Sequence, residues 1–115
     1  MIARAGYVPA RGDFVRMVLD PRIGREQSGE RRALVLSDRP FNELTGCIFV
    51  APVTGTRRGW PFEVSLPSGG KKSGVVLADQ TKRIDHAARH VRYISPAPNG
   101  LIDAVLQLVS AILML

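Results

Sequence analysis

Short hydrophobic runs, separated by glycine and proline, occupy most of the chain before residue 95. Such runs predict β-strands, because the apolar positions of an amphipathic helix would recur every three to four residues. In the first run Val15, Met17 and Leu19 alternate and therefore share one face. The second run is apolar on both faces and is expected to be a central strand. The strands predicted in this way are 13–19, 33–37, 47–53, 62–66, 74–78 and 90–94.

The C-terminal segment 101–115 follows a helical period instead. Its polar positions form one narrow stripe, whereas a helix that rests on one sheet needs only about a third of its circumference to be apolar. The excess apolar surface predicts a second buried contact, most simply with another copy of the chain. The polar stripe consists of Asp103, Gln107 and Ser110.

The flanking residues predict where this helix starts and stops. Ser95-Pro96 or Asn99 is expected to cap its start, and its end is expected near Met114. The segment is shorter than the ~20 residues of a membrane-spanning helix and carries polar side chains, so we expect no membrane span. Short strands followed by one helix predict a mainly β fold, a small barrel or sandwich, in one domain over residues 1–115.

Composition and charge narrow the class of partner. With 45% hydrophobic and 23% charged residues among 115, the chain resembles an ordinary globular domain. Its net charge of +6 and its pI near 10.4 favour polyanions, with nucleic acid first and an acidic protein segment second. The single cysteine, Cys47, rules out an intramolecular disulfide and predicts a reducing cytoplasm. Residues 1–7 contain no apolar run long enough for a signal peptide.

Basic residues gather in three glycine-rich loops between the predicted strands, at 21–31, 55–59 and 67–73. One interpretation is a solvated rim that keeps strand edges from pairing with other chains. The other is a phosphate-binding surface carried by loops on a rigid scaffold, and charge alone favours neither. The basic residues on these loops or at their edges are Arg22, Arg25, Arg31, Arg32, Arg57, Arg58, Lys71 and Lys72.

Several well-known catalytic patterns are incomplete in this chain. His86 and His90 stand four apart, as two metal ligands on a helix could, but no convincing third ligand accompanies them, so we expect no metal site. Cys47 lies within an apolar run, which predicts a buried, inert thiol. The glycine- and lysine-containing segment 69–73 lacks the spacing of a phosphate-binding loop and is expected to form a hairpin tip.

Five sequence blocks are more specific than any of these features. They are Tyr7-Val8-Pro9 with Gly12-Asp13 and Asp20-Pro21, then Glu26-Gln27-Ser28-Gly29-Glu30-Arg31, Ala51-Pro52-Val53-Thr54, Gly59-Trp60-Pro61-Phe62-Glu63-Val64, and finally the segment from Gly74 to Lys82. The residues in these blocks, their order and their spacing make the chain from Tyr7 to Leu115 resemble the MazF/PemK family of toxins.

The resemblance implies a small SH3-like β-barrel of the PemK/CcdB type, with a C-terminal helix, that works as a homodimer. It implies sequence-selective, metal-independent cleavage of single-stranded RNA, messenger RNA included, without a cofactor. It also implies inhibition by a cognate antitoxin whose disordered, acidic segment covers the active groove. All of these partners place the protein in the cytoplasm.

The family's motifs also imply site residues. Its catalytic arginine falls on Arg31, its threonine on Thr54, and an acidic residue often implicated beside them on Glu26. The family usually has proline after that arginine, whereas here Arg32 follows, which adds charge and leaves the choice between the two arginines open. For Trp60, stacking on a base and packing at a strand entrance both remain possible. The residues expected to contact RNA are Arg25, Gln27, Arg32, Arg57, Arg58, Asp79, Gln80 and Lys82.

RNA carries its own nucleophile, the 2′-hydroxyl next to the scissile phosphate. The protein has to align it, remove its proton, stabilise the charge of the phosphorane and protonate the leaving 5′-oxygen. Arg31 suits the phosphate because its planar fork gives two donors, and Thr54 can donate one more hydrogen bond. A guanidinium stays protonated, so Glu26 is the better base, although an ion pair with Arg25 or Arg31 would explain it equally well.

Two other functions share part of this pattern. A gyrase poison of the CcdB type would have a similar fold without nuclease activity, but such proteins act through a C-terminal tryptophan, whereas the only tryptophan here is Trp60. A non-catalytic nucleic-acid-binding module would keep the charge and the fold, but the joint presence of Arg31 and Thr54 argues against it. Incubation with RNA in EDTA, followed by mapping of the ends, separates the three functions.

Overall fold

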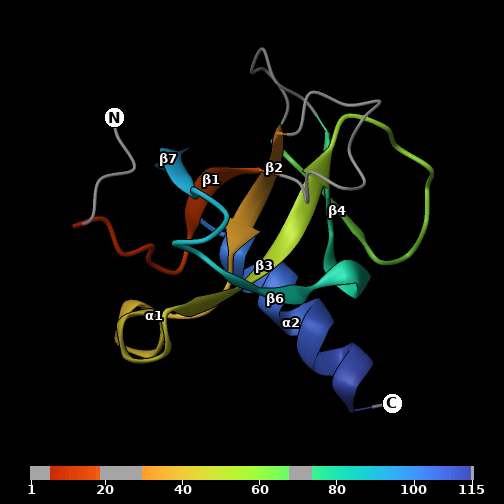
Figure 1. Cartoon of the computed structure of the whole chain (residues 1–115). Coiled ribbons are helices and arrows are strands. Elements are labelled where there is room, and N and C mark those ends of the chain that lie inside the picture. The colour runs from red at the N-terminus through yellow and green to blue at the C-terminus, as the bar shows by residue number, and fades with distance from the viewer. Residues whose placement is uncertain (1–5, 19–29, 68–73, 115) are drawn as a thin grey trace.

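The computed structural model describes residues 6–18, 30–67 and 74–114. Within them, seven strands pair into one antiparallel sheet, with helix α2 below it and helix α1 at one corner (Figure 1). The strand order is β4-β5-β3-β2-β1-β7, and β6 pairs with the first half of β3. The elements are β1 (Asp13–Val18), β2 (Glu30–Val35), α1 (Arg39–Thr45), β3 (Cys47–Thr54), β4 (Glu63–Ser65), β5 (Val75–Leu77), the 3-10 helix η2 (Ala78–Gln80), β6 (Lys82–Asp85), β7 (Arg92–Pro96) and α2 (Leu101–Leu113).

The long strand β3 organises the sheet because it pairs with β2, β5 and β6. Among the described strands, β4 and β7 form the two ends of the path, so strand pairing bends the sheet without closing it into a ring. The mainly β fold with a C-terminal helix confirms the predicted fold class, with the barrel open between β4 and β7. All six predicted strands are present, with ends shifted by at most three residues; Leu19, the predicted end of the first, lies outside the described residues.

Two apolar clusters lie on opposite faces of β2. Backbone alternation directs Leu34 and Leu36 into the cluster beneath α2, and directs Ala33 and Val35 into the cluster on the other face. All four side chains are at most 5% exposed, which confirms the prediction of a central strand. Because both faces are packed against other parts of the chain, β2 is a rigid base for the residues at its ends.

Helix α2 packs on the first cluster through Leu101 and Val105, both buried. The predicted caps of this helix are wrong. Its N-cap is Gly100, with no capping side chain, whereas Ser95-Pro96 belongs to β7 and is held in the pairing with β1. No helix in the described part of the chain is long and apolar enough to cross a membrane.

The short helix α1 has no counterpart in the prediction. Asp38 caps its start by accepting a backbone hydrogen bond in the first turn, and Gly46 forms its C-cap. Its one buried side chain is Asn42, whose amide nitrogen donates to the carbonyls of Pro9 at 2.8 Å and Ser37 at 3.0 Å. A buried amide needs such partners, so α1 is tied to the preceding chain by polar contacts rather than by an apolar stripe.

Strand β6 was also missing from the prediction. Only Ile84 is buried among its four residues, so a charged strand of this length gives no recognisable alternation. Its pairing brings Lys82, one of the residues predicted to contact RNA, opposite Val50 of β3.

The first of the five sequence blocks closes the N-terminal side of the sheet. The hydroxyl of Tyr7 donates to Asp13 Oδ2 at 2.9 Å, and the same oxygen accepts from the Ala10 backbone N–H. Burial, reinforced by the Asp13 carboxylate, raises the pKa of Tyr7, so the phenol stays protonated and keeps donating. Tyr7 also packs on the second cluster and makes an edge contact with Tyr93 of β7.

Candidate functional site

A groove of about 380 Å³ opens where the outer ends of β2 and β3, the loop after β3 and the 3-10 helix η2 meet. Its described walls carry four cationic side chains and two carboxylates. The lining residues are Met17, Arg31, Arg32, Pro52, Val53, Thr54, Thr56, Arg58, Trp60, Glu63, Leu77, Asp79, Gln80 and Lys82.

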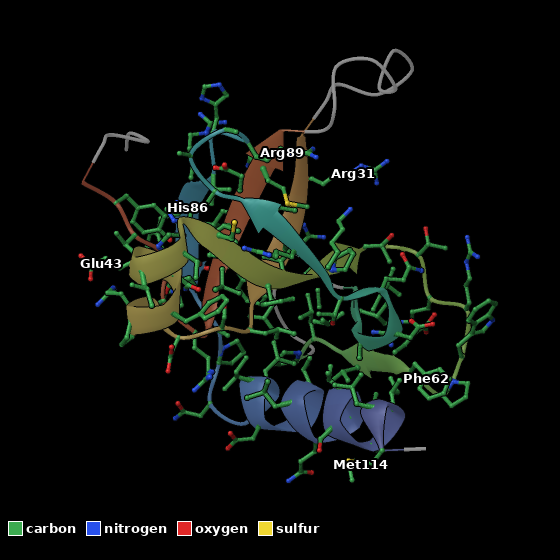
Figure 2. All side chains as sticks on the ribbon, turned by 60° about the horizontal axis from the view of Figure 1, so that its bottom comes forward. Arg31, Glu43, Phe62, His86, Arg89 and Met114 are labelled. Carbon is green, nitrogen blue, oxygen red and sulfur yellow. The ribbon has the colours of Figure 1, made fainter. Side chains whose placement is uncertain are left out.

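The sheet register brings Arg31 and Thr54 together. β2 and β3 pair Arg32 with Val53, so one position further out Arg31 stands opposite Thr54 on the adjacent strand. Opposed residues of an antiparallel pair point to the same face, with Cβ atoms roughly 5 Å apart. Arg31 is exposed, and Figure 2 shows it on the side of the sheet away from α2. Two of the three residues predicted to be catalytic, Arg31 and Thr54, therefore share one face at one end of the groove.

The Thr54 hydroxyl is held in place by its own loop. Its Oγ1 accepts a hydrogen bond from the backbone N–H of Thr56 at 3.2 Å. Because the oxygen is used as an acceptor there, the hydroxyl proton remains available for donation to a ligand. The half-buried Thr54 thus offers one oriented donor beside the fixed charge of Arg31.

Arg32 differs from Arg31 in orientation. Alternation along β2 places it on the opposite face, where its cross-strand neighbours are Arg16 and Val53. Its half-buried side chain borders the groove from that side, whereas Arg31 lies on the face of Thr54. This geometry favours Arg31 over Arg32 as the partner of Thr54, the choice that the sequence left open.

Lys82, Asp79 and Gln80 form the wall across from β2. Lys82 stands opposite Val50 in the register of β6 and β3, hence on the Thr54 face. Asp79 and Gln80 are both exposed on η2, a turn closed by a hydrogen bond from Thr81 Oγ1 to the Ala78 carbonyl at 2.9 Å. All three were predicted to contact RNA, and all three line the groove.

The remaining predicted residues divide into two groups. Arg58 lines the groove, whereas the Arg57 guanidinium on the same loop donates to Ser65 Oγ at 2.8 Å, on β4. Arg25, Glu26 and Gln27 lie outside the described residues, as do most of the predicted loop 21–31 and the whole of the predicted hairpin tip 69–73. The roles predicted for Arg25, Glu26 and Gln27 therefore stay predictions.

Seven groove residues were not among the predicted site residues. Four of them are apolar, and the three that offer polar or aromatic groups are Thr56, Trp60 and Glu63. Trp60 had two open roles, and the residue is 54% exposed on the groove wall. Glu63 lies in one of the five sequence blocks, but the block assigned it no role, and a lone carboxylate in a basic protein predicts only a surface ion pair.

The two histidines lie in a turn, not on a helix. His86 Nε2 is 3.4 Å from the Asn42 carbonyl oxygen, and His90 is exposed with a φ of 51°. Within the described ranges, no three His, Cys, Asp or Glu side chains gather as a metal site would require. Cys47 is half-buried at the start of β3, so it is more accessible than the predicted buried thiol.

A glycine supports the backbone of Thr54 directly. Gly74 has a φ of 147°, and a Cβ atom added there would lie 2.4 Å from the Thr54 carbonyl oxygen. We expect Gly74→Ala to lower stability by about 1–3 kcal/mol, seen as a Tm lower by roughly 4–12 °C, and to reduce activity because Thr54 must move. Thermal unfolding measures the first effect. Gly55→Ala is the matched control, since a Cβ there meets nothing within 4 Å, and an equal loss in both variants would contradict this explanation.

Residues 10–113 match the family described as PemK-like, MazF-like toxins of type II toxin-antitoxin systems. The chain therefore belongs to this toxin family. It is 46% identical to the endoribonuclease toxin MazF of Escherichia coli K12 over 89 aligned residues. The alignment covers 77% of this chain and 78% of that protein. It is 36% identical over 107 residues to the endoribonuclease PemK of Escherichia coli, covering 90% of this chain and 80% of the relative.

Solved structures give the same result. The fold matches the crystal structure of MazF (Form-I) from Deinococcus radiodurans with a TM-score of 0.82 and 38% identity, over 95% of this chain and 99% of that one. It also matches a MazE-MazF crystal structure from the same organism with a TM-score of 0.80 and 36% identity, over 93% and 96% of the two chains.

Proposed function

We propose that this protein is an endoribonuclease toxin that cleaves single-stranded RNA, messenger RNA included, at selected sequences. Two relatives, 46% and 36% identical over the aligned residues, are named endoribonucleases. The single observation that carries the proposal is the groove, in which Arg31 and Thr54 share one face beside Lys82. Such a surface provides positive charge for the RNA backbone and directed donors for one phosphate.

In the proposed reaction the 2′-hydroxyl of the RNA attacks the neighbouring phosphorus. The bond from phosphorus to the 5′-oxygen of the next nucleotide breaks, which leaves a 2′,3′-cyclic phosphate and a 5′-hydroxyl. Arg31 donates two hydrogen bonds to the phosphate oxygens as their negative charge grows, and Thr54 donates a third. Donors fixed before reaction cost no reorganisation when the charge develops, which is the basis of their effect on rate.

Two proton transfers complete the reaction. A base takes the 2′-hydroxyl proton and an acid protonates the leaving 5′-oxygen. Glu26 is our proposed base, supported by its place in the block that ends at Arg31. The described groove walls carry two carboxylates, Glu63 and Asp79. Glu63 already accepts hydrogen bonds from its own loop, so Asp79 is the carboxylate there that remains available for a proton transfer.

The proposal is tested with purified protein and a mixed-sequence RNA in excess EDTA. We expect cleavage at a short recurring sequence, with 2′,3′-cyclic phosphate and 5′-hydroxyl ends on mapping. Loss of cleavage in EDTA would contradict the metal-independent reaction. Intact RNA in both the presence and the absence of metal would leave a binding module or a gyrase poison, and inhibition of gyrase distinguishes those two.

We also propose two protein partners. A cognate antitoxin with an acidic, disordered segment suits a groove in which cations outnumber carboxylates, and a relative forms a MazE-MazF complex. The second partner is another copy of the chain, in a homodimer. Messenger RNA as target and a chain with one cysteine support a cytoplasmic place of action.

The homodimer has a direct test. At the end of α2, Leu113 is 77% and Met114 is 81% exposed, an apolar surface that is costly in water. We expect sedimentation at micromolar concentration to give about twice the chain mass of 12.6 kDa. Replacing both residues with serine should weaken the dimer, and a monomer in the unaltered protein would contradict the proposal.

A further inference from the structure

The chain's only tryptophan stands on the wall of the groove. Trp60 lies on the loop between β3 and β4, which curves out from the sheet in Figure 1. The residue is 54% exposed and lines the groove together with Arg58 and Glu63. Exposing more than half of an indole forfeits the burial that makes tryptophan favourable in a fold. The exposed ring is therefore better explained by a ligand than by packing within the chain.

The loop that carries Trp60 is held by a single carboxylate. Glu63 accepts hydrogen bonds from the backbone N–H of Arg58, at 3.2 Å to Oε1 and 3.0 Å to Oε2, and from that of Gly59, at 3.1 Å to Oε1. Two successive N–H groups aimed at one anion form a nest, and the φ of 75° at Gly59 gives the backbone the left-handed turn that this requires. The Glu63 carboxylate is thus bound by the backbone of its own loop.

A second set of backbone bonds fixes the turn itself. The N–H of Glu63 donates to the Trp60 carbonyl at 3.2 Å, closing a turn with Pro61 in its second position, where proline is favoured. The N–H of Ala78 then donates to the Phe62 carbonyl at 3.0 Å. Because Ala78 begins η2, the tryptophan turn is tied to the element that carries Asp79 and Gln80.

We propose that Trp60 is a stacking site for one nucleobase of the strand bound in the groove, and that Glu63 is the positioning residue that holds it there. The inference rests on the proposed function, because it requires a single-stranded nucleic acid in the groove. An aromatic ring on a braced turn loses little conformational freedom on binding, so most of its stacking energy contributes to affinity. Stacking uses the π-face that every base has, so this subsite favours a base over bare backbone without choosing among bases.

The first test uses intrinsic fluorescence, excited at a wavelength that tyrosine absorbs weakly. The probe is an end-labelled, mixed-sequence 20-mer of single-stranded 2′-O-methyl RNA, which lacks the nucleophile and stays intact. Its label reports binding independently of the tryptophan. We expect quenching of Trp60 emission at saturation, and little quenching by an abasic 20-mer with the same phosphates at its own saturation.

Cleavage of unmodified RNA is measured in parallel, so that the two proposals fail separately. Cleavage without base-dependent quenching would overturn the stacking site and leave the nuclease intact. Quenching without cleavage would overturn the nuclease and leave a base-binding groove. The absence of both signals would overturn both proposals.

Variants at Trp60 separate stacking from general contact. Trp60→Ala should weaken binding of the 2′-O-methyl probe by roughly 5- to 150-fold, as expected for the loss of one stacked base. Trp60→Phe is the matched control, because it keeps a ring and should lose much less. Affinity for the abasic probe should be equal in all three proteins, and an equal loss for both probes would overturn the assignment.

The role of Glu63 is tested through its effect on Trp60. Glu63→Ala removes all three hydrogen bonds to the loop, whereas Glu63→Gln keeps the Oε1 acceptor and should restore part of the affinity. We expect the loss to appear in KM with kcat little changed, together with faster rotation of the indole in fluorescence anisotropy. In a Trp60→Ala background Glu63→Ala should add no further loss of probe affinity, and a full additional loss would overturn its positioning role.

Discussion

Arg31→Ala should lower the rate of RNA cleavage by on the order of 10²–10³, with near-native melting and an unchanged oligomeric state. The substitution removes a fixed positive charge and two donors from the place where we expect the phosphorane charge to develop. Arg31 is exposed at the outer end of β2, so its truncation leaves the two apolar clusters intact. Single-turnover cleavage at saturating enzyme measures the chemical step apart from RNA binding.

Thr54 should matter less than Arg31 because a neutral hydroxyl supplies one hydrogen bond. Thr54→Ala should reduce the same rate by roughly tenfold to a hundredfold. Thr54→Ser is its matched control, since it keeps both the donor and the oxygen that accepts from the Thr56 N–H. If Thr54→Ser is as impaired as Thr54→Ala, the methyl group rather than the hydroxyl is what the reaction needs.

The neighbouring arginine provides the control for register. Arg32 lies on the other face of β2, so Arg32→Ala should weaken RNA binding in a salt-dependent way and leave the single-turnover rate at saturation largely intact. A dead Arg32→Ala with an active Arg31→Ala would reverse the roles of the two residues. Normal cleavage by both would mean that Arg31 binds RNA without a part in the chemistry.

The parts of the fold that the sequence predicts are those with a strong apolar pattern. The buried run around Leu34 and the helix around Val105 each bury what their hydrophobic periods indicate. Helix α1 depends instead on the polar contacts of Asn42, and β6 has only Ile84 in the core, so neither has a period to detect. The capping signals of α1, Asp38 before it and Gly46 after it, were present in the sequence and could have located it.

The site residues also divide into those that a sequence pattern predicts and those that it does not. Arg31 and Thr54 lie in sequence blocks of the family, and their juxtaposition follows from a register that only strand pairing sets. Glu63 could not be predicted, because its function depends on two backbone N–H groups that face it only when Gly59 adopts a left-handed conformation. Sequence patterns identify side chains that act on a ligand more readily than side chains that act on the backbone.

The oxygen that attacks the phosphate can be removed from the substrate instead of from the protein. An RNA with a single 2′-deoxyribose on the 5′ side of the cleaved bond should resist cleavage at that bond altogether, because no other group in the proposed reaction can form the cyclic phosphate. Phosphates and bases are unchanged, so binding should be close to that of the unmodified strand, apart from any contact to the missing hydroxyl.

Two controls make this substrate decisive. A deoxyribose placed one nucleotide further along should leave cleavage at the original bond largely intact. The resistant strand should also compete with unmodified RNA at a similar concentration, which shows that it occupies the groove. Cleavage of the deoxyribose-substituted bond at the normal rate would mean that water is the nucleophile. In that case Arg31 and Thr54 would bind a phosphate that is attacked from outside the RNA, and the products would carry no cyclic phosphate.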